Sequence, residues 1–252
     1  MSSPSHQQPP SLHLHTYFRS SCSARLRLAL HLKHLPFTTT AIHLLRNEQS
    51  APTYTALNPS ASVPTLTHTV ATTTTSSPTS TDKPAPTTVT IPQSIPALEY
   101  LDEAFPHTRA LYPPPTQPAQ RALVRTLVSV IACDVQPLTN ARTMKAVNAV
   151  GGEGQAWARE WTVRGLDAFE RILEGVGGGE EREGKAVCVP DVGLSAADVC
   201  LVPAVWAAQR WGCDLERWPR IMAVVRYMEG LPEVKAAHWR RQDDTPEEFR
   251  EG

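Results

Sequence analysis

The sequence predicts a protein of two parts, an α/β domain followed by an all-helical domain. Three observations predict this fold class. The first 45 residues change from strand-like to helix-like hydrophobic spacing and back, a proline-rich stretch begins at residue 106, and the amphipathic segments beyond it have helical periodicity. A chain of 252 residues, of which 41% are apolar, is long enough to bury a core in each part.

The first three elements are predicted to be a strand, a helix and a strand. Residues 12–18 alternate, with leucines on one face and histidines on the other, which is typical of a strand. Residues 23–34 carry leucines at helical spacing, and Pro36 stops that helix. Residues 37–45 are rich in Thr and Ile and indicate a second strand. Because a helix crosses over between them, we expect the two strands to be parallel.

The rest of the α/β part contains two further strand signals, an unusual loop and a helix. A strand opens at residues 63–66, and strand-like sequence resumes at 87–91. Residues 67–90 contain eleven threonines but only one acidic and one basic residue, so we expect a mobile loop insertion with little to bury. Residues 93–105 indicate a short helix, in whose first turn Pro96 is tolerated.

A linker and a set of helices follow. The proline-rich stretch is expected to be semi-rigid, and the helix that starts near residue 123 must be kinked or broken at Pro137, which has no amide proton. Ser195 and Asp198 have the spacing of a capping box ahead of an apolar helix. We expect a disordered tail at 1–11, an α/β domain at 12–105, a linker at 106–117 and a helical domain at 118–252, with further helices at 156–173, 221–229 and 233–238 and a loop at 175–185.

Charge and composition argue against several classes of partner. Lys plus Arg total 24 and Asp plus Glu total 25, so the chain lacks the basic excess with which nucleic-acid-binding proteins neutralise phosphates. The longest apolar run, 200–208, is far shorter than the roughly 20 residues that span a bilayer. Residues 1–11 resemble neither a secretory nor a transit signal, and the five cysteines show no metal-ligand spacing. We therefore expect a cytoplasmic protein with reduced thiols and without nucleic-acid or membrane partners.

The strongest chemical signal is the run Ser20-Ser21-Cys22-Ser23, which lies where the first strand gives way to the first helix. The N-terminal end of a helix has unpaired amide groups and about half a positive charge, so it stabilises an anion. Hydroxyl donors there can hold a thiolate, either that of Cys22 or that of a bound small thiol. Lowering the thiol pKa by about two units corresponds to about 2.7 kcal/mol. The plainer alternative is that the run only caps the helix.

Two further motifs are weaker when each is taken alone. Val63-Pro64 precedes a strand, a setting in which the X-Pro bond can be cis and a backbone edge can be left open to an extended peptide. Gln93-Ser94 opens a helix, so this pair either receives a carboxylate or simply caps that helix.

A polar pair marks the predicted break in the helical part. Gln136 and Asn140 are spaced i, i+4 on either side of Pro137, which places them on one helix face. Polar pairs at a broken helix often line a cavity. Taken alone, the pair does not distinguish a cavity-lining site from an ordinary polar pair on a helix.

Together these motifs resemble those of one family. The run YFRSSCSARLRLAL, residues 17–30, is similar to the N-terminal signature of the zeta-class glutathione transferases, the maleylacetoacetate isomerases. The resemblance covers about residues 12–66 and 91–249. The other stretches that agree, in order, are ALNP at 56–59 with VPTL at 63–66, QS at 93–94 with EYL at 99–101, VQPL at 135–138 with Asn140, ADVCLVP at 197–203, and the tail from Ala237 to Pro246.

The resemblance implies a thioredoxin-like domain followed by a helical domain, a homodimer, and glutathione bound in the cleft between the domains. It implies that Ser20, Ser21 and Cys22 surround the glutathione sulfur. The contacts implied for the rest of glutathione are Gln49, Val63, Pro64, Gln93 and Ser94, with Gln136 and Asn140 reaching it from the helical domain. Arg210 and Arg25 are the implied contacts of an acidic substrate, since an arginine fork suits a carboxylate.

The implied activity is the glutathione-dependent isomerisation of maleylacetoacetate to fumarylacetoacetate in phenylalanine and tyrosine catabolism. The glutathione thiolate adds to the cis double bond, gives an enolate with a rotatable single bond, and then leaves, so glutathione acts as a cofactor and no metal is required. Other functions stay open. They are a glutathione transferase or dehalogenase acting on small α-halo acids, a thiol reductase that uses Cys22, and a catalytically silent binding protein.

The chain departs from the family at several positions. Ala24 stands where some members have a bulky aromatic residue, a change expected to enlarge the pocket. Pro92 and Pro96 flank Gln93-Ser94, where members usually have other residues, and are expected to distort that end of the glutathione site. The threonine-rich stretch 67–90 is longer than the usual turn.

Overall fold

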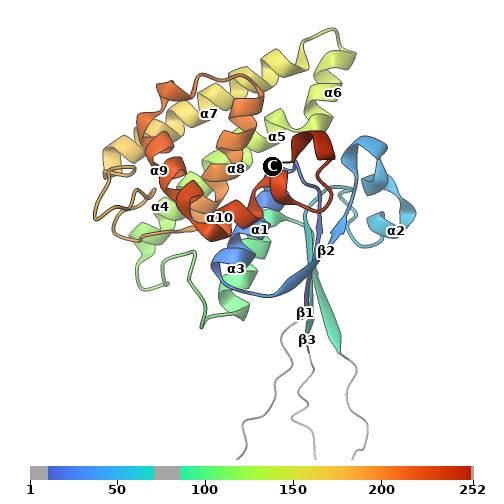
Figure 1. Ribbon diagram of the computed structural model, residues 1–252, viewed down its shortest axis with the longest axis horizontal. Helices are drawn as coiled ribbons and strands as arrows, with labels where there is room; N and C mark the ends of the chain where they lie inside the picture. The colour runs from blue at the N-terminus through green and yellow to red at the C-terminus, as the bar shows by residue number, and fades with distance from the viewer. Residues whose placement is uncertain (1–10, 71–85, 251–252) are drawn as a thin grey trace, which may run out of the picture.

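The computed structural model describes residues 11–70 and 86–250, and a four-stranded mixed sheet in the order β2-β1-β3-β4 organises its first part (Figure 1). Strand β1 (Ser11–Thr16) pairs in parallel with β2 (Phe37–Ala41). Strand β3 (Thr65–Val70) runs antiparallel to β1 and to β4 (Thr87–Ile91). The predicted parallel pair is confirmed, although β2 ends earlier than expected.

Helix α1 (Ser21–Leu32) covers one face of the sheet and is buried on nearly every side. Leu28 is fully buried and belongs to the same hydrophobic core as Leu14 of β1. Figure 1 shows α1 and α3 (Ser94–Ala104) on one side of the sheet and the short helix α2 (Pro52–Thr55) on the other. Each fully buried leucine stabilises the fold by about 1.5–3 kcal/mol. Helix α1 is therefore fixed firmly, and its N-terminal end lies at one edge of the molecule's core.

The threonine-rich loop predicted over 67–90 is shorter than expected. Residues 67–70 belong to β3 and residues 87–90 to β4, where pairing between the two strands suits the branched threonine side chains. The rest of that predicted loop, 71–85, lies outside the described residues. The predicted N-terminal tail also lies outside them, except for Ser11, which begins β1.

The chain beyond residue 117 is helical, as predicted. Its helices are α4 (Pro118–Ser129), α5 (Gln136–Thr139), α6 (Ala141–Ala149), α7 (Gly154–Val176), α8 (Ala196–Arg210), α9 (Pro219–Gly230) and α10 (Pro232–Ala237). Helix α4 passes into a wider π-helical turn at Val130–Val135 and then into α5, which has Pro137 in its first turn. The predicted interruption is therefore present. Helix α6 has no counterpart among the predicted elements.

Helix α8 lies at the centre of the helical part, and the predicted capping box fixes its start. The fully buried carboxylate of Asp198 accepts hydrogen bonds from the backbone N–H of Ser195 (2.8 Å), the Ser195 hydroxyl (2.9 Å) and the backbone N–H of Cys188 (2.8 Å). Burial raises the pKa of this carboxyl. Helix α8 packs directly against α1, so the capping box positions a helix that borders the start of α1.

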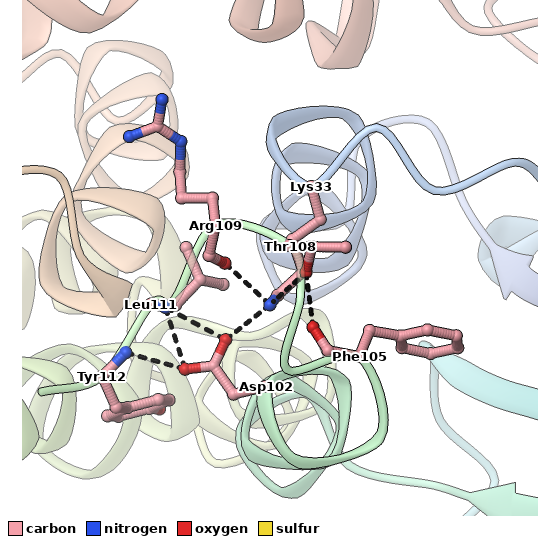
Figure 2. Close-up of polar contacts among 7 residues, drawn as sticks. All are labelled: Lys33, Asp102, Phe105, Thr108, Arg109, Leu111 and Tyr112. Carbon is pink, nitrogen blue, oxygen red and sulfur yellow. Dashed lines mark hydrogen bonds and ion pairs between the residues drawn. The ribbon is translucent and has the colours of Figure 1, made fainter. Parts of the chain in front are cut away.

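A buried ion pair fastens the proline-rich linker to the α/β part (Figure 2). The Lys33 ammonium lies 2.6 Å from a carboxylate oxygen of Asp102 and donates a hydrogen bond to the carbonyl oxygen of Arg109 at 2.8 Å. Asp102 in turn accepts hydrogen bonds from the backbone N–H groups of Leu111 and Tyr112, each at 2.8 Å. These contacts hold the end of α1, the end of α3 and the linker in one arrangement.

One helical stretch among the described residues, Pro118–Thr139, is long and apolar enough to cross a membrane by length and composition alone. Its inner side packs against α8, and less than half of its most apolar part is buried. The exposed side carries small residues at helical spacing, namely Ala122, Thr126 and Ser129. In this fold the stretch is a packed helix with one open side.

Candidate active site

The turn between β1 and α1 places the serine–cysteine run at the start of the helix. Ser20 is the N-cap residue of α1, and its hydroxyl oxygen accepts a hydrogen bond from the backbone N–H of Ser23 at 3.1 Å. Ser21 and Cys22 lie in the first turn and are half-buried, and neither side chain has a hydrogen-bond partner among the described residues. Ser20 therefore does cap the helix. The Ser21 hydroxyl and the Cys22 thiol are left available at its positive end.

Contacts from distant parts of the chain hold the backbone of this turn. Arg27 is fully buried in α1, and its guanidinium donates hydrogen bonds to the carbonyl oxygens of Phe18 (3.1 Å) and Ala237 (3.2 Å). Asp244, in the C-terminal segment, accepts a hydrogen bond from the backbone N–H of Phe18 at 2.8 Å. The backbone just before Ser20 is therefore held through both its carbonyl and its amide group.

A small cavity lies between this turn and α8, and two arginines face it. It is narrow, with a volume of about 10 Å³, and its polar lining comes from Arg19, Ser20, Ser21 and Arg210. No carboxylate of the described residues lines it. A guanidinium nitrogen of Arg210, Nη1, donates to the carbonyl oxygen of Arg19 at 3.2 Å, whereas its buried Nε has no partner. Burial and then the charge of Arg19 lower the pKa of Arg210 to about 10, so this arginine is cationic at neutral pH.

Apolar and aromatic side chains form the other walls of the cavity. Ala24 lies on the α1 side, and the indole rings of Trp206 and Trp239 also line the space. The Trp206 indole N–H donates to a carboxylate oxygen of Glu229 at 2.8 Å, and its ring centroid lies 4.6 Å from that of His238. These contacts fix the ring of Trp206. The space beside Ala24 is therefore bounded by tryptophans and stays narrow.

The peptide bond between Val63 and Pro64 is cis, the conformation considered in the sequence analysis. Both residues are buried, and Val63 belongs to the same small hydrophobic cluster as Phe18. The cis bond thus lies close to the turn that carries the serines. Gln49 is half-buried in a short 3-10 helix, Glu48–Ser50. Its side-chain amide nitrogen donates a hydrogen bond to Oδ1 of Asn47 at 3.0 Å, and its Oε1 is buried without a hydrogen-bond partner.

Helix α3 begins at Ser94, with Gln93 as its N-cap residue, so Pro92 and Pro96 do not disrupt the start of the helix. Ser94 is buried, and its hydroxyl oxygen accepts a hydrogen bond from Nη1 of Arg25 at 3.1 Å. Arg25 is only 2% exposed and does not line the cavity beside Arg210. The structure therefore brings Arg25 together with Ser94, and not with the other residue expected to contact the substrate.

Gln136 and Asn140 do not share a helix face, and that expectation is wrong. Helix α5 ends one residue before Asn140, whose backbone is extended. The Asn140 side chain caps α6 by accepting a hydrogen bond from the backbone N–H of Thr143 at 2.9 Å. Arg142, just after this cap, donates to the carbonyl oxygen of Ala61 at 3.1 Å. The start of α6 therefore contacts the loop that precedes the cis-proline.

Five residues described above were absent from the predicted set. Arg19 directly precedes the run Ser20-Ser21-Cys22-Ser23, so its place next to that run could have predicted it as a site residue. The others are Arg27, Trp206, Trp239 and Asp244, whose roles depend on contacts between α1, the turn, α8 and the C-terminal segment. No local pattern in the sequence predicts contacts between residues so far apart along the chain.

Comparisons with known proteins agree with this geometry. Residues 19–104 match the family model for the glutathione S-transferase N-terminal domain. The chain is 46% identical to the maleylacetoacetate isomerase of Aspergillus fumigatus, over 96% of each chain, and 36% identical to that of Mus musculus, over 94% of this chain and 96% of the relative. The structure of maleylacetoacetate isomerase from Anaeromyxobacter dehalogenans with bound GSH superposes with a TM-score of 0.75, at 34% identity, covering 95% of this chain and all of that one.

The thioredoxin-like sheet domain joined to a helical part has the glutathione transferase fold. Within that fold, the chain belongs to the zeta class, the maleylacetoacetate isomerase family.

Proposed function

We propose that this protein is an enzyme that converts maleylacetoacetate to fumarylacetoacetate, with glutathione as its cofactor, in the breakdown of phenylalanine and tyrosine. The observation that carries the proposal is the free Ser21 hydroxyl at the positive end of α1, beside a cavity faced by Arg19 and Arg210. A thiolate and a dicarboxylate are both anions, and this site provides donors for one next to cations for the other. The curated relatives named as isomerases support the same assignment.

Glutathione is proposed to lie across the turn, the cis-proline and the start of α3. Its sulfur lies against Ser20, Ser21 and Cys22, and its peptide extends along the backbone at Val63-Pro64. Gln49, Gln93 and Ser94 contact its polar ends, and Gln136 and Asn140 border it from the helical part, where Arg142 contacts the loop before Pro64.

The reaction needs a nucleophile that can add and then leave. The glutathione thiolate attacks one carbon of the cis double bond, and the electron pair of that bond moves onto the conjugated carbonyl oxygen, which gives an enolate. The former double bond is now single and rotates. The enolate then expels the thiolate and forms the trans double bond, so no atom is gained or lost. Arg19 and Arg210 hold the carboxylates and stabilise the negative charge of the enolate.

The decisive experiment is an isomerase assay of the purified protein on maleylacetone, with and without glutathione. We expect fumaryl product only with glutathione. Removing the donor to the sulfur in Ser21→Ala should lower kcat/KM by about 100-fold or more, whereas Cys22→Ser should cost much less. Thr162→Val is a matched control, because it removes a buried hydroxyl without a partner far along the chain in α7. Glutathione-independent turnover, or an unimpaired Ser21→Ala variant, contradicts the mechanism.

The half-buried Cys22 thiol favours one second candidate function. It has no hydrogen-bond partner among the described residues and lies in the first turn of α1, so it is placed to attack a disulfide. A protein that acts as a thiol reductase should lose all activity in Cys22→Ser and little in Ser21→Ala, the reverse of the order expected for the isomerase. Dehalogenation of a small α-halo acid needs only the glutathione thiolate, and release of halide distinguishes it from isomerisation.

We further propose a cytoplasmic homodimer with two domains, joined at residues 106–117. The open side of the helix Pro118–Thr139 supports the dimer, because it is a face of small residues on an apolar helix beside a groove lined by Arg121 and Arg125. Light scattering should give twice the chain mass, and Ala122→Arg should shift the mass to that of one chain. A wild-type mass of one chain contradicts the dimer. Five free cysteines are consistent with a reducing compartment, and cell fractionation tests that location.

A further inference from the structure

Arg25 is a buried cation without a counter-ion. Its side chain extends from α1 into the interior and is 2% exposed. No carboxylate among the described residues forms an ion pair with it, and its Nε is buried without a hydrogen-bond partner. An unpaired buried charge costs several kcal/mol, far more than a hydrophobic residue of similar size. A position that keeps such a charge needs an anion from elsewhere.

Two buried groups that interact electrostatically with Arg25 do not provide that anion. They are the Cys200 thiol and the Tyr112 phenol. Burial raises the pKa of Cys200 to about 11 and raises that of Tyr112 well above its usual range, so both are neutral at pH 7. The Tyr112 hydroxyl also lacks a hydrogen-bond partner among the described residues. Neither Cys200 nor Tyr112 therefore balances the charge of Arg25 at neutral pH.

The one hydrogen bond that Arg25 makes leads to the start of α3. Its Nη1 donates to the hydroxyl oxygen of Ser94 at 3.1 Å, and Ser94 is 4% exposed. Because Arg25 occupies a lone pair of that oxygen, the Ser94 hydroxyl proton is free to be donated to another group. Helix α3 has eleven residues, and the side chain of its N-cap residue, Gln93, does not cap it. The backbone N–H groups of its first turn, the Ser94 hydroxyl and the Arg25 charge thus converge on one small region.

We propose that Arg25 is a positioning residue for glutathione, which acts through Ser94 to bind the α-carboxylate of the γ-glutamyl residue. This inference rests on the function proposed above and replaces the expected role of Arg25 in holding the acidic substrate. The carboxylate accepts the Ser94 hydroxyl proton and the first N–H groups of α3, and its charge compensates that of the guanidinium below. The carboxylates of the substrate then bind to Arg19 and Arg210, which line the cavity between the turn and α8.

The test compares two thiols that differ only in this carboxylate. Isothermal titration of the intact wild-type protein is carried out with glutathione and with 4-aminobutyryl-cysteinylglycine, which lacks the α-carboxylate of the γ-glutamyl group. Wild type should bind glutathione more tightly by roughly tenfold or more, the range for hydrogen bonds to a charged group. In Arg25→Gln this preference should fall close to one, because glutathione loses affinity and the analogue does not. A purely structural role for Arg25 would weaken both thiols equally and leave their ratio unchanged.

Two further variants complete the test. Ser94→Ala should also reduce the preference, whereas Thr162→Val should retain that of wild type. If Arg25→Gln does not fold, Arg25→Lys, which keeps a charge but not the planar fork, should lower the preference in part. A wild-type preference that survives in the folded Arg25 variant overturns the inference while the proposed isomerase stands. If wild type binds neither thiol at millimolar concentration, the proposed function itself fails.

Discussion

Replacing Asp244 by Ala should weaken both the fold and the glutathione site, although Asp244 does not line the cavity. Its carboxylate accepts the backbone N–H of Phe18 at 2.8 Å, and Phe18 is 2% exposed. The variant leaves a buried amide without a partner and removes a negative charge that stabilises the cationic form of the buried Arg27. A hydrogen bond to a charged acceptor contributes about 1.5–3 kcal/mol, so we expect the free energy of unfolding to fall by about 2 kcal/mol.

This loss has a thermal and a kinetic consequence. For a chain of this length, about 2 kcal/mol corresponds to a decrease in Tm of about 4–8 °C. The turn that carries Ser20 and Ser21 also loses one of the hydrogen bonds that fix it, and misplacing reactive groups by about 1 Å costs up to about 100-fold in rate. We therefore expect kcat/KM for the isomerisation to fall about tenfold, mainly through a higher KM for glutathione.

Differential scanning calorimetry and steady-state kinetics measure the two effects. Asp244→Asn keeps an acceptor oxygen and should recover most of kcat/KM. Asp243→Ala is a matched control, because its exposed carboxylate makes no hydrogen bond to another described residue. If Asp244→Ala has the wild-type Tm and the wild-type KM for glutathione, the C-terminal segment does not position the turn and the reasoning is refuted.

Three further predictions concern the walls and the supports of the site. Trp206→Ala should raise kcat/KM for a bulkier, aryl-substituted cis-enedione relative to maleylacetone and lower stability by about 3–5 kcal/mol, and an unchanged ratio would show that Trp206 does not limit the cavity. Asp198→Ala removes the acceptor of three hydrogen bonds and should lower the free energy of unfolding by about 3 kcal/mol or more, and urea denaturation with a midpoint near that of wild type would contradict this. Burial and then the charge of His13 lower the pKa of His15 from its usual value of 6.5. The unfolded chain therefore binds a proton at His15 more readily than the folded chain, and the free energy of unfolding decreases as the pH falls below 6.5. Urea midpoints should therefore fall more steeply between pH 7.5 and 5.5 in wild type than in His15→Gln, and equal slopes would contradict the assignment.

Local signals in the sequence predicted much of the fold. The capping box of Ser195 and Asp198 depends on four consecutive residues, and Pro137 interrupts any helix that reaches it. The bounds of β4 follow from threonine, valine and isoleucine in sequence. For the residues flanking 71–85, the threonine-rich composition was misleading, because pairing with β1 and between β3 and β4 decides whether threonine forms a strand.

Some residues of the candidate site could be predicted from the sequence and others could not. Ser20 and Ser21 could be placed because the start of a helix is visible in the sequence, and the cis bond at Pro64 was anticipated as one of two conformers. The pairing of Gln136 with Asn140 failed, because it assumed a helix that in fact ends between them. Periodicity predicts neighbours only while the element continues.

The arginines show most clearly what the sequence cannot supply. Arg19, Arg25 and Arg27 lie within nine residues of one motif and carry the same charge, yet each has a different environment. Arg25 and Arg27 are about 200° apart around α1, so one reaches Ser94 of α3 and the other reaches the backbone before Ser20. Arg19 precedes the helix and faces the cavity with Arg210. Because a bound tripeptide and a dicarboxylate together bring several negative charges into one cleft, they need cations at separate places. The turn before α1 supplies Arg19, α1 supplies Arg25, and α8 supplies Arg210.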